Sequence, residues 1–229
     1  CGSVCTLAFS AFPWYFLVFG PLYSNLAAFA VVPIAIFITI TVVESCCLGH
    51  VGIRDGLIVL AMGASLASLQ PNAVFSVVVL SAPFCIGTIM KLLAERGISI
   101  KRRAVVSIAA IGLVLIVWVL LWMAPPLSAT VTYPWPAIEG KCQAVIDVAT
   151  LALRSNVPQL VLGLLVFAGA IYCIVKKNNR ALVVSYGICA LMFFICVTSD
   201  GTVRSLVDGF WYNDAYRIAA LVALAGIPL

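Results

Sequence analysis

The sequence predicts an all-α fold, a polytopic transmembrane helical bundle, and three observations lead to this fold class. First, 64% of the 229 residues are hydrophobic and only 9% are charged, with a mean hydropathy of +1.20. A soluble domain carries about 25% charged residues, so too few polar side chains are present to cover a surface in water. Second, apolar runs recur along the chain. Third, basic residues fall between these runs, where they act as topology signals rather than as contacts to nucleic acid.

Each apolar run is expected to form a helix, and together they give six to seven spans in one transmembrane domain over residues 1–229. A transmembrane helix needs roughly 20 mostly apolar residues. Pro33 and Pro83 predict kinks inside two of the runs. The last run ends after 12 residues, so we expect a truncated span and an interior fragment of a longer protein. The runs are Leu22–Val43, Leu57–Leu69, Ala73–Leu93, Ala104–Ala124, Gln159–Val175, Ala181–Thr198 and Ile218–Leu229.

The second run, Leu57–Leu69, has only 13 residues. It is either a short tilted span or one arm of a re-entrant hairpin that turns at "QPN", Gln70–Asn72. In both cases the chain returns to the side that it left, so the orientation of the later spans is the same.

The connecting segments predict the orientation in the cell membrane. Segments 44–56, 91–103 and 176–180 hold nine of the thirteen lysines and arginines. Because basic residues favour the cytoplasm, the loops 91–103 and 176–180 are expected to be cytoplasmic, and the loops 125–158 and 199–217 extracytoplasmic. All five tryptophans then fall at or near the outer boundary, which indicates a function there.

The outer loop 125–158 is too apolar for a linker. It is expected to lie along the membrane surface, with residues 142–154 as a short amphipathic interfacial helix.

The stretch "DGFWYNDAYR", residues 208–217, gathers polar and aromatic side chains at the edge of the last apolar run. Ionisable groups at a membrane boundary are costly, so they tend to be paired or functional. Asp214 and Arg217 stand three residues apart, and a helix brings them to one face. The candidate ligand-binding residues are Asp208, Trp211, Tyr212, Asn213, Asp214 and Arg217.

Two interpretations of this stretch stay open. In the first, Asn213 or Asp214 is the N-cap of the last helix, and Arg217 extends its head group towards the membrane surface. In the second, Arg217 and free N–H groups at the helix start hold a phosphate, while Trp211 and Tyr212 stack on a sugar or a lipid. No catalytic residue is assigned.

Two other stretches of the sequence contain clustered polar or aromatic residues. The stretch "SAFPWYFLVFGPLYSNL", Ser10–Leu26, is either an aromatic anchor at the membrane interface or a broken segment that lines a cavity. "CCLGH", which contains Cys46, Cys47 and His50, lacks the four ligands of a zinc site and is expected to be a cytoplasmic turn. No phosphate-binding loop or dinucleotide motif occurs, so we expect no cofactor and no metal.

The nine cysteines do not predict a disulfide framework. Several of them lie inside apolar runs, where cysteine behaves as a small hydrophobic residue. Cys1 and Cys5, on the outer side, could pair.

Three stretches carry a family resemblance: "FPWYFLVFGPLYSNL", "QPN" and "GFWYNDAYRIAAL". Together they resemble an actinobacterial family of large multi-pass membrane proteins of unknown function, which is similar to the GT-C glycosyltransferases. The resemblance implies sugar transfer from polyprenyl-phosphate donors on the outer face of the membrane. It also implies that the catalytic acid lies in an outer loop before the residues of this chain, so that Asp214 and Arg217 are secondary donor-binding residues.

The sequence thus predicts an integral protein of the cell envelope that is part of a GT-C-like glycosyltransferase, although enzymatic activity is not established by any residue. Two alternatives stay open, a non-catalytic membrane scaffold and a transporter or flippase of envelope lipids. A transporter is expected to show inverted repeats and paired charges inside its spans, and neither is evident. The expected partners are membrane lipid and a polyprenyl-phosphate-linked sugar, with no nucleic acid; the sequence indicates no particular protein partner.

Overall fold

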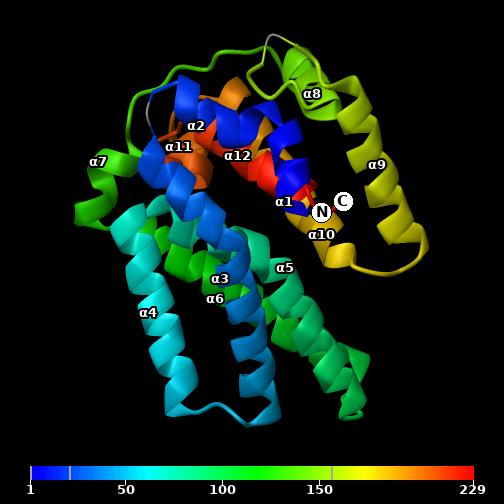
Figure 1. Ribbon diagram of the computed structural model, residues 1–229. Coiled ribbons are helices and arrows are strands. Elements are labelled where there is room, and N and C mark those ends of the chain that lie inside the picture. The colour runs from blue at the N-terminus through cyan, green and yellow to red at the C-terminus, as the bar shows by residue number, and fades with distance from the viewer. Residues whose placement is uncertain (1, 21, 156) are drawn as a thin grey trace. The chain divides into compact units, whose positions relative to one another are not determined.

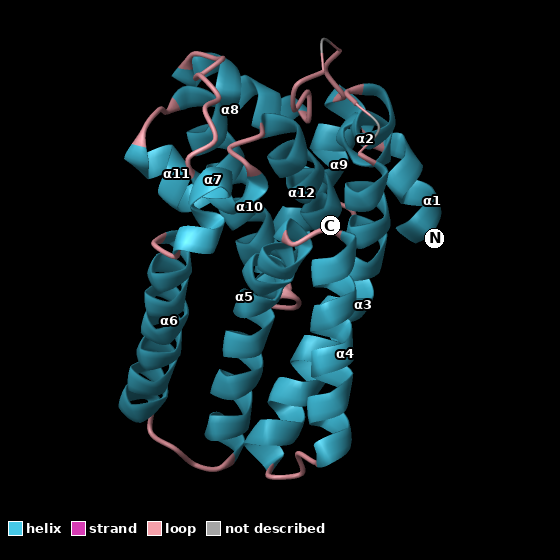
Figure 2. Cartoon of the chain, turned by 90° about the vertical axis from the view of Figure 1, so that its left-hand side faces the viewer, coloured by secondary structure: helices cyan, strands magenta, loops and turns pink. Residues whose placement is uncertain are grey.

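The computed structural model describes residues 2–20, 22–155 and 157–229, so Cys1, Pro21 and Asn156 lie outside it, as does the expected pairing of Cys1 with Cys5. Within these ranges the chain is helical with connecting turns and contains no strand, which confirms the all-α class (Figures 1 and 2). The longer helices are α3 (Tyr23–Leu48), α4 (Ile53–Leu69), α5 (Asn72–Glu95), α6 (Ile100–Trp122), α8 (Lys141–Thr150), α9 (Leu160–Val175), α10 (Arg180–Thr198) and α12 (Ala215–Gly226).

Shorter helical turns connect and flank these helices. They are α1 (Gly2–Cys5), η1 (Thr6–Ala8), η2 (Ser10–Trp14), α2 (Tyr15–Val18), η3 (Pro125–Leu127), α7 (Ser128–Val131), α11 (Thr202–Asp208) and η4 (Gly209–Trp211).

Each of the seven apolar runs forms a helix, namely α3, α4, α5, α6, α9, α10 and α12. Four of them, α3, α5, α6 and α10, are long and apolar enough to cross a membrane. Two more, α9 and α12, are apolar but have only 16 and 12 residues. These helices give the protein a membrane location. Helices α3 and α5 continue through Pro33 and Pro83.

The chain divides into two compact units, residues 27–123 and residues 1–26 with 124–229. The assignment of one domain over 1–229 stays a prediction.

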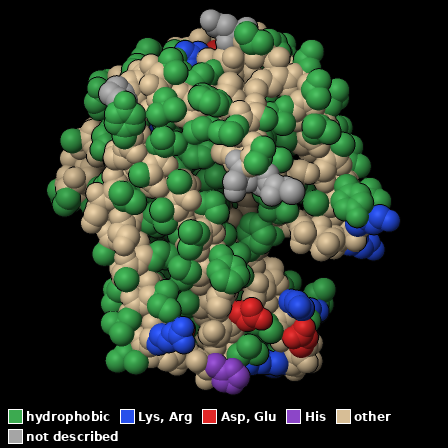
Figure 3. All heavy atoms as spheres, in the orientation of Figure 1, with side chains coloured by type: hydrophobic (Ala, Val, Ile, Leu, Met, Phe, Trp, Pro, Cys, Tyr) green, Lys and Arg blue, Asp and Glu red, His purple; other side chains and the backbone are tan. Residues whose placement is uncertain are grey.

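The unit of residues 27–123 consists of helices α3 to α6, which run alternately up and down (Figures 1 and 2). The turns 49–52 and 96–99 lie at the same end, and Arg96 Nη2 links the second turn to the end of α3 by donating a hydrogen bond to the carbonyl oxygen of Cys47. Lys, Arg, Asp, Glu and His side chains gather at this end of the unit in Figure 3.

Helix α4 is longer than the run Leu57–Leu69 because it begins four residues earlier, at Ile53. The Asp55 carboxylate accepts a hydrogen bond from the Gly52 N–H at 2.8 Å, which is one half of a capping box, because glycine has no side chain to supply the other half. At about 1.5 Å per residue, the 17 residues of α4 approach the thickness of a bilayer core. The turn at Gln70 and Pro71 then leads directly into α5.

The other unit, residues 1–26 and 124–229, is built around α12. Most residues of α12 are fully buried, and it packs against α10, η2 and α2. Glycines let neighbouring segments approach closely. A Cβ on Gly163 of α9 would lie 2.5 Å from the Ala149 carbonyl oxygen of α8, and one on Gly209 would lie 2.8 Å from Val131 Cβ.

The aromatic segment at the start of the chain belongs to the same unit and is broken into short turns. Phe9, Phe12 and Phe16 are buried, and η2 packs on α12. The Gln159 side chain fixes this segment: its Oε1 accepts from the Ser10 hydroxyl at 3.0 Å, and its Nε2 donates to the Ala8 carbonyl at 2.7 Å. The buried phenylalanines of this broken segment therefore belong to the core, while Trp14 and Val18 stay exposed.

Candidate functional site

The candidate residues 208–217 form the junction between α11, η4 and α12. Tyr212 and Asn213 both adopt left-handed backbone conformations, with φ of 62° and 54°. The two residues reverse the chain between η4 and α12. Phe210 and Trp211 are buried by this turn, so Trp211 is a core residue rather than an open stacking surface.

Asn213 holds the junction to the segment before α8. Its Nδ2 donates to the carbonyl oxygens of Val131 at 3.1 Å and Tyr133 at 2.9 Å. The Ser205 hydroxyl donates to the same Val131 carbonyl at 2.6 Å. Because buried backbone carbonyls need partners, Asn213 and Ser205 act as structural hydrogen-bond donors here.

Arg204 is a buried cation at the centre of this junction, and it was not among the candidates. Its Nη1 donates to the Trp135 carbonyl at 2.8 Å, and its Nη2 donates to the Asn213 carbonyl at 2.7 Å. Asp200, four residues earlier and just before α11, lies 3.9 Å from Nη1. The i, i+4 spacing of Asp200 and Arg204 was a signal for this pair, but the carbonyl contacts come from residues far away in the sequence.

Asp208 is fully buried, and neither of its carboxyl oxygens has a hydrogen-bond partner among the described residues. Burial raises the pKa of Asp208 well above its ordinary value, and the positive charge of Arg204 only partly opposes this shift. The structure thus places Asp208 in the interior, where the protonated form is favoured.

Asp214 and Arg217 form the pair that their spacing predicts. Asp214 is the N-cap of α12 and accepts from the Tyr216 N–H at 2.9 Å. Arg217 Nε lies 3.3 Å from the other Asp214 oxygen, Oδ2. Burial raises the pKa of Asp214, and the charge of Arg217 opposes the shift. The capped helix start is thus present, and the carboxylate is engaged in it.

Arg217 retains hydrogen-bonding capacity after these contacts. Its guanidinium carbon lies 4.4 Å from the ring centroid of Tyr212, a cation–π arrangement, and its Nη1 has no hydrogen-bond partner among the described residues. Tyr133 packs edge-on against Tyr212, with centroids 6.2 Å apart, and is followed by Trp135. Tyr133 and Trp135 are 47% and 42% exposed, so aromatic surface is accessible next to this cation.

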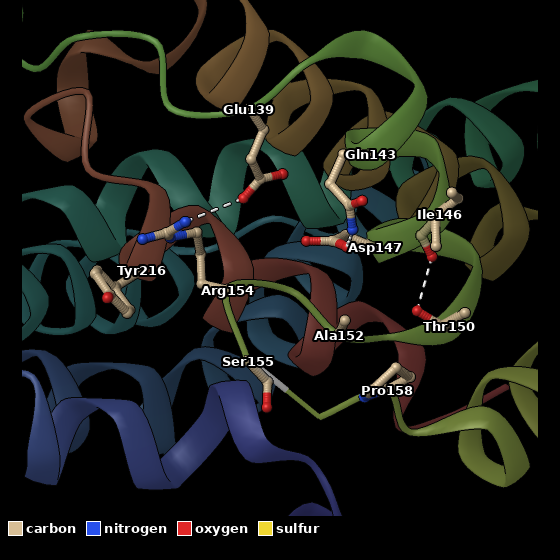
Figure 4. A pocket seen from close by; sticks show the side chains of 10 residues that line it. All are labelled: Glu139, Gln143, Ile146, Asp147, Thr150, Ala152, Arg154, Ser155, Pro158 and Tyr216. Atoms are coloured by element: carbon tan, nitrogen blue, oxygen red, sulfur yellow. Dashed lines mark hydrogen bonds and ion pairs between the residues drawn. The ribbon is translucent and has the colours of Figure 1, made fainter.

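A pocket of about 390 Å³ adjoins the first turn of α12 in the same unit (Figure 4). Arg154 lies between Glu139 and Tyr216: its Nη1 donates to Glu139 Oε1 at 3.1 Å, and its guanidinium carbon lies 5.3 Å from the Tyr216 ring centroid. The lining residues are Glu139, Gln143, Ile146, Asp147, Thr150, Ala152, Arg154, Ser155, Pro158 and Tyr216.

Two carboxyl groups face this pocket. The side chain of Glu139 is only 9% exposed, and its Oε2 has no partner among the described residues. Burial raises the pKa of Glu139; the hydrogen bond from Arg154 lowers it, and the charge of Asp147 raises it further. Gln143 Nε2 donates to Asp147 at 2.6 Å. The pair is not evident from the sequence because Glu139 and Arg154 are 15 residues apart, one before α8 and the other after it.

The chain after α8 bends sharply to bring Arg154 into the pocket. Leu151, Leu153 and Arg154 all have positive φ, at 52°, 38° and 75°, a region that is costly for residues with side chains. Leu151 and Leu153 are buried, and their packing offsets this cost. The expected interfacial helix over 142–154 corresponds to α8, which ends at Thr150.

Tyr216 is fixed on the other side by the aromatic segment at the start of the chain. Phe19 stacks on its ring with centroids 3.8 Å apart, and Tyr15 contacts it edge-on at 5.3 Å. The Tyr216 ring therefore orients Arg154 rather than offering an open face to a ligand.

Within the described part of the chain, no three or more His, Cys, Asp or Glu side chains gather so that they could hold a metal ion.

The comparisons with known proteins give one result. The model of DUF6541, a family of unknown function, matches residues 1–229, and the chain therefore belongs to this family. No curated protein and no solved structure matches the chain.

Proposed function

We propose that this member of DUF6541 is part of a GT-C-like glycosyltransferase of the cell envelope, which takes sugars from polyprenyl-phosphate carriers at the outer face of the cell membrane. The proposed orientation rests on the distribution of basic residues, with the loops 91–103 and 176–180 in the cytoplasm. The segments 125–158 and 199–217, which contain the candidate site, are then extracytoplasmic.

The observation that supports a carrier-phosphate site best is the free hydrogen-bonding capacity of Arg217. Its Nε and Nη1 are buried and have no hydrogen-bond partner among the described residues, while the Asp214 carboxylate and the Tyr212 ring lie beside the guanidinium. A guanidinium binds phosphate oxygens well because its N–H groups match their geometry. The exposed rings of Tyr133 and Trp135 offer apolar surface to the sugar or to the first isoprene units.

The chemistry would be a substitution at the anomeric carbon. An acceptor hydroxyl attacks this carbon, the bond to the phosphate oxygen breaks, and the carrier phosphate leaves with the electron pair. A base takes the proton of the hydroxyl. Arg217 would stabilise the negative charge that grows on the leaving phosphate.

A non-catalytic scaffold is the second candidate, and one observation favours it. Most polar groups of the junction are used inside the fold: Asn213 and Arg204 bind backbone carbonyls, and Trp211 and Asp208 are fully buried. A scaffold would need this junction for folding only, so a stable variant that lacks the Arg217 charge would keep full function.

The experiment compares lipid extracts of cells that lack the protein with cells that carry the wild type, Arg217→Ala or Arg217→Lys. We expect carrier-linked sugar to accumulate without the protein and with Arg217→Ala, because the phosphate contact is lost. Lysine keeps the charge without the paired N–H geometry, so Arg217→Lys should restore function in part.

Membrane abundance of each variant, measured by immunoblot, is the control. If Arg217→Ala is as abundant as the wild type and clears the carrier-linked sugar equally well, the donor-site proposal is wrong and the scaffold is favoured.

A further inference from the structure

The pocket beside α8 has a chemical character that differs from the surroundings of Arg217. Two carboxyl groups, Glu139 and Asp147, and one guanidinium, that of Arg154, line it together with amide and hydroxyl groups. The cation of this lining, Arg154, is already paired with Glu139, and Asp147 lies close enough to Glu139 to raise its pKa. The lining therefore has no free cation to offer a phosphate and favours an uncharged ligand.

The lining also leaves both hydrogen-bond acceptors and donors for a ligand. Glu139 Oε2 and Arg154 Nε are buried and lack a hydrogen bond of good geometry among the described residues, although the Asp147 carboxyl lies beside Glu139 and Tyr216 beside Arg154. In Figure 4 one Glu139 oxygen meets Arg154, and the other points away from it, on the side of Gln143. The Ser155 Oγ accepts from the Val157 N–H at 3.1 Å, so its proton remains available to donate.

A hydroxyl group needs this combination, because it donates one hydrogen bond and accepts others. Buried polar groups without partners are costly, and a ligand that supplies the missing bonds recovers this cost. Natural ligand sites usually occupy about 300–1,000 Å³. The 390 Å³ of this pocket lies at the low end, which suits one or two sugar rings.

We propose that this pocket binds an uncharged sugar, with Glu139 accepting a hydrogen bond from one of its hydroxyl groups. The assignment of the sugar to the transfer reaction rests on the proposed function, but the binding itself does not. The bound ring is either that of the acceptor glycan or that of the carrier-linked donor, and the same contacts serve both.

The local fold supports a preformed site. The left-handed residues after α8 direct Arg154 towards Glu139, and the Tyr216 ring holds the guanidinium from its other side. Gly163 lets α9 lie directly against the end of α8. A preformed site loses little conformational entropy on binding, which favours affinity.

The test measures sugar binding by saturation-transfer NMR and calorimetry on the full chain in detergent micelles. The probes are uncharged disaccharides of glucose, mannose, galactose and arabinose, with glucose 1-phosphate and inorganic phosphate as charged counterparts. We expect at least one uncharged sugar to bind more tightly than the phosphates. Glu139→Ala should weaken that binding roughly 10-fold or more, since it removes a hydrogen bond to a charged group.

Glu139→Ala also leaves Arg154 unpaired and could lower stability, so a second variant keeps the ion pair. Ile146 lines the pocket and is half exposed. Ile146→Trp should fill the space and abolish sugar binding while the thermal midpoint stays near that of the wild type. The matched control is Val145→Trp, at an exposed neighbour on α8 that does not line the pocket, and this variant should bind the sugar as the wild type does.

The outcomes separate this inference from the proposed function. If no uncharged sugar binds, or if Ile146→Trp and Glu139→Ala bind it as well as the wild type, the inference is wrong. If the sugar binds at this pocket but Arg217→Ala still binds a short-chain polyprenyl phosphate normally, the inference stands and the donor site fails.

A competition binding experiment shows whether the bound sugar ring belongs to the donor or to the acceptor. If a short-chain polyprenyl-phosphate glucose displaces the bound disaccharide, the pocket takes the donor sugar. If both bind together, it takes the acceptor.

Discussion

Helices α6 and α12 are both apolar, yet they lie in opposite surroundings. The most apolar window of α6 has no buried residue, whereas α12 is buried along almost its whole length. Composition explains the difference: six of the twelve residues of α12 are alanine or glycine, and α6 is rich in leucine, valine and isoleucine. In a membrane, small residues let helices approach and branched apolar residues face lipid. Hydropathy thus indicates that a helix lies in a membrane, and side-chain size indicates whether it faces lipid or packs against other helices.

The largest test of this contrast is Leu221→Ala in α12 against Leu113→Ala in α6. Leu221 is fully buried and Leu113 is 63% exposed. In micelles the unfolded helix stays in detergent, so the loss of side-chain transfer free energy is small for both variants. The cavity and the lost dispersion contacts therefore dominate the change in the free energy of unfolding. We expect a loss of about 2–3 kcal/mol in the free energy of unfolding for Leu221→Ala and below about 0.5 kcal/mol for Leu113→Ala.

The measurement is unfolding by SDS titration in mixed micelles, followed by circular dichroism. Equal losses for both variants would mean that α12 is not the core of its unit.

The next test adds one methyl group in each region. A Cβ on Gly163 would meet the Ala149 carbonyl oxygen at 2.5 Å, while one on Gly112 of α6 would meet nothing within 4 Å. Gly163→Ala should therefore cost about 1–3 kcal/mol, since α8 and α9 must separate. Gly112→Ala should be neutral or stabilising by up to about 1 kcal/mol, because alanine is the better helix former. The same sign for both variants, in the same titration, would contradict the close packing of α8 on α9.

A third test concerns the buried acid of the α12 unit. The pKa of Asp208 is raised in the folded state. The Asp208 carboxyl therefore costs no stability at low pH, and the free energy of unfolding falls as the pH rises towards the folded-state pKa. Asp208→Asn does not titrate, so its advantage over the wild type should grow between about pH 5 and about pH 8. The gain amounts to roughly 1.4 kcal/mol for each unit of pKa shift.

The matched control is Glu95→Gln in the other unit, where the carboxylate is exposed. Thermal midpoints of all three proteins across this pH range give the answer. A pH-independent difference between Asp208→Asn and the wild type would show that Asp208 has its ordinary pKa.

The sequence predicted the features that depend on residues close together in the chain, namely the helices and one ion pair. All seven apolar runs form helices, and Asp214 meets Arg217 because helical residues three apart share a face. It did not predict the pocket, since Glu139 and Arg154 come together only when α8 folds back and the chain bends through left-handed residues. Nor did it predict that Asp208 and Trp211 are interior, because polar and aromatic residues at a span edge look the same whether they face lipid, ligand or core.

The smallest effects are expected at the helix starts, where each of the two units has one carboxylate cap. Asp214 caps α12 from a buried position, and Asp55 caps α4 from the surface. Removing a cap by mutation to alanine costs about 0.5–2 kcal/mol. We expect Asp214→Ala near the upper end of this range, because it also leaves Arg217 without its partner, and Asp55→Ala near the lower end.

Asp214→Asn should keep the cap, since asparagine is an equally good N-cap residue, while it removes the negative charge beside Arg217. If Asp214→Asn is stable but clears carrier-linked sugar more slowly, the charge has a role beyond capping. If it matches the wild type in both stability and clearance, Asp214 is a cap alone, and the proposed donor site is reduced to Arg217 and its aromatic neighbours.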